Sequence, residues 1–305
     1  MSNNPKIAAI VPCYNEELTI GNVVRDLKRA VPDIVVYVFD NNSKDKTAAI
    51  AKEAGATVIR EKRQGKGFVV QSMFRVVDAD VYIMVDGDDT YDLLELPKMI
   101  AVVTNDEADM VVGNRLKHYT DKSFRPLHTF GNKLVKTLIN KFFNAEIKDV
   151  MSGFRVMSRS FAKNINITAA GFEVETEMTI KALKNSFLIR EIDIQYKERP
   201  PGSFSKLNTF HDGFLVIKTI FMIFRDYKPL LFFSGVSFLF LLISAISGWV
   251  VIVEFIETRY ITHVPLAILA TGCMILAMIF FITGIILDSF GRRFDELFNY
   301  IRNKD

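Results

Sequence analysis

The sequence predicts an α/β domain built on an open parallel or mixed sheet, followed by a C-terminal transmembrane helical hairpin. Three observations lead to this prediction. Short, wholly apolar segments alternate with helical patterns up to residue 85. Polar clusters follow three of these segments, and two long uncharged runs come after residue 228.

The alternating segments give the expected order of strands and helices. Strands are expected at residues 7–11, 34–39, 57–60 and 81–85, and helices at residues 18–30, 45–54 and 68–77. Strands that are apolar throughout are typical of a parallel sheet with helices on both faces. Ligands of such a sheet bind outside the carboxyl ends of the strands.

The polar clusters occur at those strand ends. Residues 14–17 follow the first strand, residues 40–45 the second and residues 86–90 the fourth. Because the carboxyl ends of parallel strands lie at one edge of a sheet, we expect the three clusters to form one site.

The apolar excess of the chain lies after residue 228. Residues 229–253 and 264–287 carry no charged side chain and are long enough to cross a hydrocarbon core of about 30 Å. A short loop joins them, which predicts a hairpin; two buried core helices are the alternative. Residues 210–224 read as an amphipathic helix in the membrane interface, or else as a buried core helix. Residues 134–143 form a second amphipathic candidate.

Basic residues flank the two apolar runs on the outside. By the positive-inside rule, we expect both termini and the α/β domain on the cytoplasmic side, the flanking residues being Arg225, Lys228, Arg292, Arg293, Arg302 and Lys304. The expected organisation is an α/β domain over 1–208, an interface helix over 209–228, two spans over 229–288 and a basic cytoplasmic tail over 289–305.

Composition narrows the function classes. A net charge of only +3 argues against a nucleic-acid binder driven by bulk charge. Cys13 and Cys273 are far apart and read as packing residues in a reducing compartment, not as a disulfide or metal site. The first residues lack the pattern of a signal peptide, so we expect the N-terminal part in the cytoplasm.

Asp86 and Asp88 form the sharpest chemical motif. Closely spaced carboxylates at a strand end supply the hard oxygen ligands that Mg²⁺ or Mn²⁺ prefers, and such an ion bridges a diphosphate. A solvated acidic turn is the alternative. Residues 40–45 could bind a base or ribose, or could only form a turn and cap a helix. The glycine turn at 63–67 could approach a phosphate but lacks the spacing of a P-loop.

Cations are scattered through the second half of the domain. Asp149 and Arg155 flank a small, tight segment. Taken singly, each of the remaining cations reads as a surface charge, but together they could clamp the phosphates of two anionic substrates: Arg115, Arg125, Arg199 and Lys206.

Taken in order, these segments resemble the family-two glycosyltransferases, and within them the polyprenyl-phosphate hexose synthases. The resemblance covers nearly the whole α/β part and rests on VPCYNEE (11–17), DNNSKDKT (40–47), RQGKG (63–67), VDGDDTY (85–91), GNR (113–115), DVMSGFR (149–155), GFEVETEM (171–178) and ERPPGSFSKLNT (198–209). Any one of these segments is a weak signal, whereas eight in order are a strong one.

The resemblance implies a GT-A fold, which is Rossmann-like, a divalent metal ion, and inverting transfer of a sugar to a lipid phosphate. By position, it implies nucleotide-sugar binding by Pro12, Tyr14, Glu16, Asp40, Lys66 and Asp86, with Asp86 and Asp88 at the metal. It implies that the acceptor phosphate or donor diphosphate is bound by Arg115, Arg125, Arg199, Ser205 and Lys206. Asp149 and Asp86 would be the catalytic carboxylates, Asp149 acting as base or positioning residue, and Glu173 or Glu175 would at least brace the site.

One departure bears on the donor. The mannose synthases of this type usually carry Gln where this chain has Thr90. We therefore expect a UDP-sugar carrying a hexose or N-acetylhexosamine, and undecaprenyl phosphate as acceptor. A GDP-mannose enzyme is the alternative.

Other classes fit less well. A catalytically silent membrane scaffold or flippase partner would not need the carboxylates. A processive polysaccharide synthase needs a Q-x-x-R-W segment, and Trp249 lies inside a span. A hydrolase is disfavoured because no nucleophile–His–acid arrangement is found among four histidines. We also expect a homo-oligomer, because small hairpins often associate.

Overall fold

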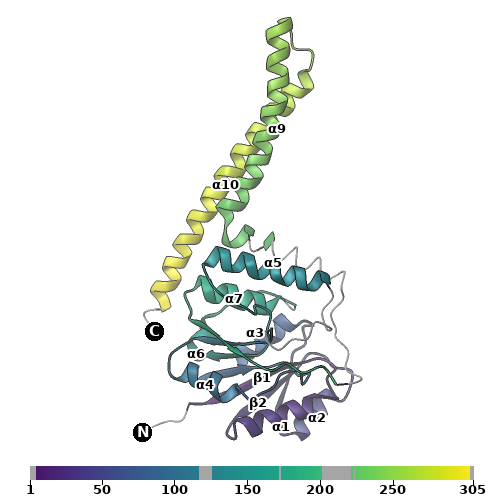
Figure 1. Ribbon diagram of the computed structural model, residues 1–305, viewed down its shortest axis with the longest axis vertical. Helices are drawn as coiled ribbons and strands as arrows, with labels where there is room; N and C mark the ends of the chain where they lie inside the picture. The colour runs from purple at the N-terminus through teal and green to yellow at the C-terminus, as the bar shows by residue number, and fades with distance from the viewer. Residues whose placement is uncertain (1–4, 117–125, 172, 201–220, 223, 303–305) are drawn as a thin grey trace. The chain divides into compact units, whose positions relative to one another are not determined.

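A computed structural model describes residues 5–116, 126–171, 173–200, 221–222 and 224–302 of the chain (Figure 1). Its contacts divide the chain into two compact units, Met1–Val216 and Ile217–Asp305. The expected boundary at 208/209 and most of the expected interface helix at 210–224 lie outside the described residues. The four-part division of the chain therefore stays a prediction.

In the described part of the first unit, seven strands form one sheet in the order β3-β2-β1-β4-β6-β5-β7. The strands are β1 (Ile7–Cys13), β2 (Val35–Asp40), β3 (Thr57–Arg60), β4 (Val81–Met84), β5 (Met110–Asn114), β6 (Arg155–Ser158) and β7 (Ile189–Asp193). The first four strands pair in parallel, whereas β6 runs antiparallel to both β4 and β5. The sheet is therefore mixed, and its first four strands occupy the predicted segments.

Helices cover both faces of this sheet, as Figure 1 shows. One face carries α1 (Ile20–Ala30), α2 (Thr47–Glu53) and α4 (Leu96–Thr104); the other carries α3 (Lys66–Val76), α6 (Arg159–Asn164) and α7 (Val174–Lys184). Successive side chains of a strand point to opposite faces. Ala9 and Val11 of β1 accordingly join the first core, and Ala8 and Ile10 join the second.

Two helices begin later than their apolar patterns predict, because polar side chains form turns ahead of them. The Asp45 carboxylate accepts the backbone N–H of Thr47 at 3.0 Å and its hydroxyl at 2.5 Å, so α2 starts at Thr47. The carbonyl of Glu16 accepts the N–H groups of Thr19 and Ile20, and α1 starts at Ile20. These turns leave the polar clusters in loops at the sheet edge.

The amphipathic candidate at 134–143 lies in α5 (Pro126–Phe143). Val135 and Ile139 are fully buried within the first unit, where α5 contacts α7. Leu134, in contrast, is exposed. Packing in the α/β unit, one of the two roles considered for this helix, is therefore what the structure shows.

The second unit contains an antiparallel pair of long helices, α9 (Pro229–Thr258) and α10 (Val264–Arg302) (Figure 1). The Ser237 hydroxyl donates to the carbonyl of Ala277, and the Ser244 hydroxyl donates to that of Ala270, both at 2.7 Å. In the described residues these two helices are long and apolar enough to cross a membrane, with a mean hydropathy of 2.5. Only 11% of each apolar window is buried, unlike the buried core helices considered as the alternative.

Candidate active site

The loops after β1 and β2 are joined by hydrogen bonds. The N–H of Asn15 donates to the Ser43 hydroxyl at 2.9 Å, and the N–H of Lys44 donates to the Asn15 side chain at 2.8 Å. The N–H of Glu16 donates to the Thr47 hydroxyl at 2.8 Å. The first two polar clusters therefore form one continuous rim at the carboxyl ends of β1 and β2.

The loop after β4 joins the same rim. The Thr19 hydroxyl donates to the carbonyl of Gly87 at 2.7 Å. Each of the three loops also contains one residue with a left-handed backbone: Asn15 (φ 54°), Asn42 (φ 63°) and Asp89 (φ 58°). Asn and Asp adopt this conformation more readily than other residues with a side chain. The three strand ends therefore turn sharply at one place, as the clusters predicted.

The glycine turn at 63–67 is attached to the end of β2 by Asn41. The side chain of Asn41 donates to the carbonyl of Arg63 at 2.7 Å and accepts the N–H of Gly65 at 2.8 Å. A Cβ on Gly67 would lie 2.0 Å from the carbonyl oxygen of Ala169, so this position requires glycine. The turn thereby delivers Lys66, the first residue of α3, to the site.

Lys66 lies between two carboxylates. Its ammonium is 2.5 Å from Asp86 Oδ1 and 2.5 Å from Glu175 Oε1, and its side chain is only 12% exposed. Burial alone would lower the pKa of Lys66, but the two carboxylates outweigh burial and raise it. Lys66 is therefore a fixed positive charge, and Glu175, whose role was left open, is one of its two partners.

Asp88 is buried and has two partners of its own. Arg199 contacts its Oδ2 at 2.5 Å, and the Thr90 hydroxyl donates to its Oδ1 at 2.6 Å. Burial and the nearby Asp86 raise the pKa of Asp88, against the opposing effect of Arg199. Thr90, noted in the sequence as a departure, thus orients the carboxylate that precedes it by two residues.

Arg115 and Asp149 form a bidentate pair beside these groups. Arg115 Nε and Nη2 donate to the two carboxylate oxygens at 2.8 and 3.0 Å. Burial raises the pKa of Asp149, but the charge and hydrogen bonds of Arg115 outweigh it, so the pKa lies below its ordinary value. The guanidinium carbon of Arg115 also lies 5.5 Å from the ring centroid of Tyr196.

Arg155 holds the segment between Asp149 and β6 from inside the protein. It is fully buried, and it donates to the carbonyls of Val150 and Ser152 at 2.8 and 2.9 Å and to that of Glu175 at 2.9 Å. Burial lowers the pKa of Arg155 to about 10. Arg155 therefore fixes the segment that carries Asp149 relative to the helix that carries Glu175.

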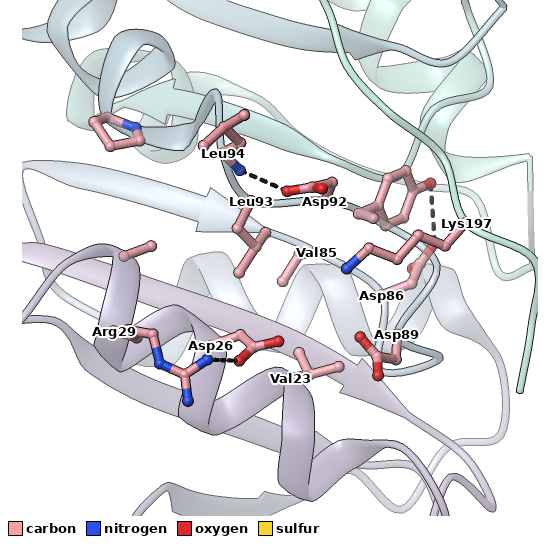
Figure 2. A pocket seen from close by; sticks show the side chains of 13 residues that line it. Val23, Asp26, Arg29, Val85, Asp86, Asp89, Asp92, Leu93, Leu94 and Lys197 are labelled. Carbon is pink, nitrogen blue, oxygen red and sulfur yellow. Dashed lines mark hydrogen bonds and ion pairs between the residues drawn. The ribbon is translucent and has the colours of Figure 1, made fainter. Parts of the chain in front are cut away.

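A pocket of about 350 Å³ opens beside Asp86, between α1 and the residues before α4 (Figure 2). Figure 2 shows Asp86, Asp89 and Lys197 near one another, and the ion pair of Asp26 and Arg29 on α1. Pockets for small ligands have volumes of about 300–1,000 Å³. The pocket beside Asp86 is therefore large enough for part of a small ligand.

The structure brings most of the predicted site residues to this edge of the sheet. Pro12 is buried at the end of β1 and Tyr14 is half-buried in the following loop. The remainder of this group comprises Glu16, Asp40, Lys66, Asp86, Asp88, Arg115, Asp149, Glu173, Glu175 and Arg199. Arg125, Ser205 and Lys206 lie outside the described residues.

Sequence reasoning missed two aromatic residues at the centre of this arrangement. Tyr91 and Tyr196 form an isolated antiparallel bridge, and their ring centroids are 5.4 Å apart. Tyr91 lies inside the segment VDGDDTY and could have been noticed there. For Tyr196, 105 positions further along the chain, no motif gave a signal.

The sequence profile of glycosyl transferase family 2 matches residues 8–165, just over half of the 305-residue chain. The chain belongs to this family. Among similar proteins, the dolichyl-phosphate hexose transferase of Haloferax volcanii is 31% identical over 214 residues, which are 70% of this chain and 92% of that protein. Protein RfbJ of Shigella flexneri is 48% identical over 128 residues, which are 42% of this chain and 99% of RfbJ.

Solved structures confirm the fold. The glucosyl-3-phosphoglycerate synthase of Mycobacterium tuberculosis, solved with Mn²⁺, UDP and glucosyl-3-phosphoglycerate, superimposes with a TM-score of 0.60 at 18% identity. The match covers 73% of this chain and 80% of the synthase. The predicted GT-A fold is thus confirmed, and with family membership the chain is a glycosyltransferase.

Proposed function

We propose that this family 2 enzyme transfers a hexose or N-acetylhexosamine, with inversion, from a nucleotide-sugar to a polyprenyl phosphate at the cytoplasmic face of the membrane. A UDP-sugar and undecaprenyl phosphate are the proposed substrates. The observation that carries the proposal is the exposed apolar hairpin on the same chain as the glycosyltransferase site. A lipid phosphate stays at the bilayer surface, and the hairpin keeps the enzyme there.

The relatives support this acceptor class. The dolichyl-phosphate hexose transferase of Haloferax volcanii bears a lipid phosphate in its name and matches over 70% of this chain. The Mycobacterium tuberculosis synthase was solved with UDP and Mn²⁺, which supports a UDP-sugar and a divalent ion here.

The residues present fit a divalent ion shared with the substrate. The carboxylates of Asp86 and Asp88 carry hard oxygens that already contact Lys66 and Arg199, so a divalent ion would use their remaining lone pairs. No group of three or more His, Cys, Asp or Glu side chains suited to a metal occurs among the described residues, so substrate phosphates would complete the coordination. Mg²⁺ is commonly held by one or two carboxylates together with substrate phosphates. When bound, such an ion supplies positive charge that stabilises the departing diphosphate.

The fixed cations of the site bind the donor diphosphate and the acceptor phosphate. Lys66 and Arg199 each lie 2.5 Å from a carboxylate of the β4 loop, so they are positioned at the donor side. Arg115 lies beside Asp149 and serves the acceptor. A phosphate monoester is largely a dianion at neutral pH, since its second pKa is about 6. Its oxygen attacks the anomeric carbon without first giving up a proton, and the side chains orient it.

Asp149 acts on this proposal as a positioning residue. Both of its carboxylate oxygens accept hydrogen bonds from Arg115, and its lowered pKa makes it a weak base. The N–H of Met151 donates to the same carboxylate at 3.2 Å. Asp149 therefore fixes the orientation of the Arg115 guanidinium, which serves the acceptor phosphate on this proposal.

The hairpin also implies a topology. Because α9 and α10 are antiparallel, the ends of the hairpin emerge on one side of a bilayer. By the positive-inside rule, the cytoplasmic side is supported by Arg225 and Lys228 before the first helix and by Arg292 and Arg293 late in the second. The catalytic unit and both termini then face the cytoplasm.

The test is direct transfer by the full-length enzyme. Purified protein is incubated with undecaprenyl phosphate, Mg²⁺ or Mn²⁺, and one radiolabelled donor at a time from a panel of UDP-sugars and GDP-mannose. We expect label to enter the organic phase for a UDP-sugar, and a variant Asp88→Ala to transfer at least about 100-fold more slowly. Reactions without lipid and with a chelator are the controls.

The outcomes separate the alternatives. Transfer only from GDP-mannose would replace the donor but keep the acceptor. No transfer from any donor, with lipid and metal present, would favour the silent scaffold. Near-normal turnover by Asp88→Ala would refute the role given to the β4 loop.

A further inference from the structure

The Tyr91 side chain is buried where the donor side and the acceptor side of the site meet. It is 5% exposed, and its hydroxyl oxygen accepts the N–H of Gly153 at 3.0 Å. The hydroxyl also donates a long hydrogen bond of 3.5 Å to Asp86 Oδ2. Tyr91 therefore contacts Asp86 directly and also holds the backbone next to it.

The backbone at Gly153 lies directly against the Asp86 carboxylate. A Cβ at Gly153 would lie 2.4 Å from Asp86 Oδ2. Lys66 contacts the other oxygen, Oδ1, at 2.5 Å. The carboxylate is thus held on one side by a charge and on the other by the segment that Tyr91 secures.

Tyr91 is itself tied to the acceptor side. The carbonyl of Thr90 accepts the N–H of Lys197 at 2.7 Å, and the ring of Tyr91 packs on Tyr196. The ring centroid of Tyr196 lies 5.5 Å from the guanidinium of Arg115. A chain of contacts therefore runs from Asp86 through Tyr91 and Tyr196 to Arg115.

We propose that Tyr91 is a positioning residue that fixes the location of Asp86 relative to the Arg115–Asp149 pair, so that the bound donor and acceptor are correctly oriented to each other. The inference rests on the proposed function, because it takes Asp86 as a carboxylate that receives the nucleotide-sugar. The hydroxyl is the essential group, since its hydrogen bond with the N–H of Gly153 at 3.0 Å holds the segment that packs against Asp86, and since it also reaches Asp86 Oδ2 at 3.5 Å. The ring provides packing against Phe154 and Tyr196.

The chain offers a matched control in Tyr82. This tyrosine lies in β4 and is fully buried. Its hydroxyl accepts the N–H of Ala79 at 3.1 Å and donates to the carbonyl of Val77 at 3.0 Å. Tyr91→Phe and Tyr82→Phe each remove one buried hydroxyl and leave one backbone N–H without that acceptor. Only the first change touches Asp86.

The experiment compares both variants with the wild type as full-length protein. Calorimetry measures binding of UDP or GDP, whichever the wild type binds, with and without Mn²⁺; transfer assays give kcat and KM for the donor. We expect Tyr91→Phe to weaken Mn²⁺-dependent nucleotide binding and to lower kcat by about 10- to 100-fold, the usual effect of losing a group that orients a metal-binding side chain. We expect Tyr82→Phe to leave both unchanged and to lower only the thermal midpoint.

A third variant, Asp86→Asn, separates failure of the proposed site from failure of the role proposed for Tyr91. If Asp86→Asn keeps binding and transfer, the proposed site itself is wrong. If Asp86→Asn loses both while Tyr91→Phe behaves like Tyr82→Phe, the site stands and the positioning role of Tyr91 is overturned. Thermal unfolding shows that each variant is folded, and Tyr91→Phe keeps the ring and therefore its packing.

Discussion

At the scale of single residues, the candidate site is built from partly or fully buried charges that already have partners. Lys66 has Asp86 and Glu175, Arg199 has Asp88, and Arg115 has Asp149. A buried charge without a partner is costly, so each pair holds its members in place before any substrate binds. Preorganised charges of this kind stabilise a transition state without having to reorient during the reaction.

The pH profile of the reaction tests the role of Asp149. Its lowered pKa keeps the carboxylate ionised throughout the range above about pH 4, so its own titration should not shape activity between pH 5 and 8. The wild-type rate should instead fall below about pH 6, where the acceptor phosphate gains its second proton. We expect Asp149→Asn to lower kcat by about 100-fold and to leave that midpoint in place.

A suitable control is Asp109→Asn, because the Asp109 carboxylate accepts the N–H of Leu188 at 2.9 Å just ahead of β5, away from the site. This variant should keep both rate and midpoint. Loss of the pH 6 limb in Asp149→Asn alone would show that Asp149 is the base.

At the scale of elements, the first four strands and the positions of their ends could be predicted. The last three strands, the order of strands in the sheet and the side-chain pairings between distant segments could not. The polar clusters follow apolar strands directly, so local patterns located Asp40 and Asp86 at one sheet edge. The contact of Asp88 with Arg199 depends on where the chain returns after β7, 111 residues later. Lys66 meets Glu175 because α7 packs beside α3, which no local pattern reports.

The segment before β6 gives a prediction at this scale. Gly153→Ala places a methyl group where Asp86 Oδ2 now lies 2.4 Å away, so either the carboxylate or the segment has to move. A displacement of about 1 Å at a reacting group can cost about 100-fold in rate. We expect such a loss of transfer in a folded protein, measured by the transfer assay together with circular dichroism.

Ser152→Ala is the neighbouring control. Ser152 is fully buried and already has a Cβ, and its hydroxyl accepts only a long hydrogen bond of 3.4 Å from Phe154 among those described for it. This variant should transfer at close to the wild-type rate. Equal losses in the two variants would mean that the segment tolerates no change at all, and that the contact with Asp86 is not the cause.

At the scale of the whole molecule, composition alone separated an α/β unit from an apolar C-terminal hairpin. The prediction depended on uncharged length, a property that needs no tertiary information. The arrangement of side chains between the helices could not be anticipated in the same way. Ser237 and Ser244 read as ordinary small residues, and their bonds to Ala277 and Ala270 depend on the register of the pair.

Charge scanning along α9 tests whether the hairpin crosses a bilayer. Leu242 lies near the middle of α9 and Ile256 near its end, and both are exposed. An arginine at the centre of a span costs about 2.5–3.5 kcal/mol, whereas one near the end reaches the interface. We expect Leu242→Arg to lower the fraction of protein that resists carbonate extraction from membranes, and Ile256→Arg to leave it unchanged. Equal extraction of both variants would contradict a spanning hairpin.

The two serine hydrogen bonds also determine how the hairpin responds to bilayer thickness. The bonds are seven residues apart on each helix, from Ser237 to Ser244 on α9 and from Ala270 to Ala277 on α10. They therefore oppose sliding of one helix along the other. The 30 residues of α9 extend over about 45 Å, compared with a hydrocarbon core of about 30 Å. A helix with excess length tilts or extends beyond the core. If the hairpin spans a bilayer as proposed, these two hydrogen bonds would hold the helices together, and we expect a thinner bilayer to tilt both of them by a similar angle.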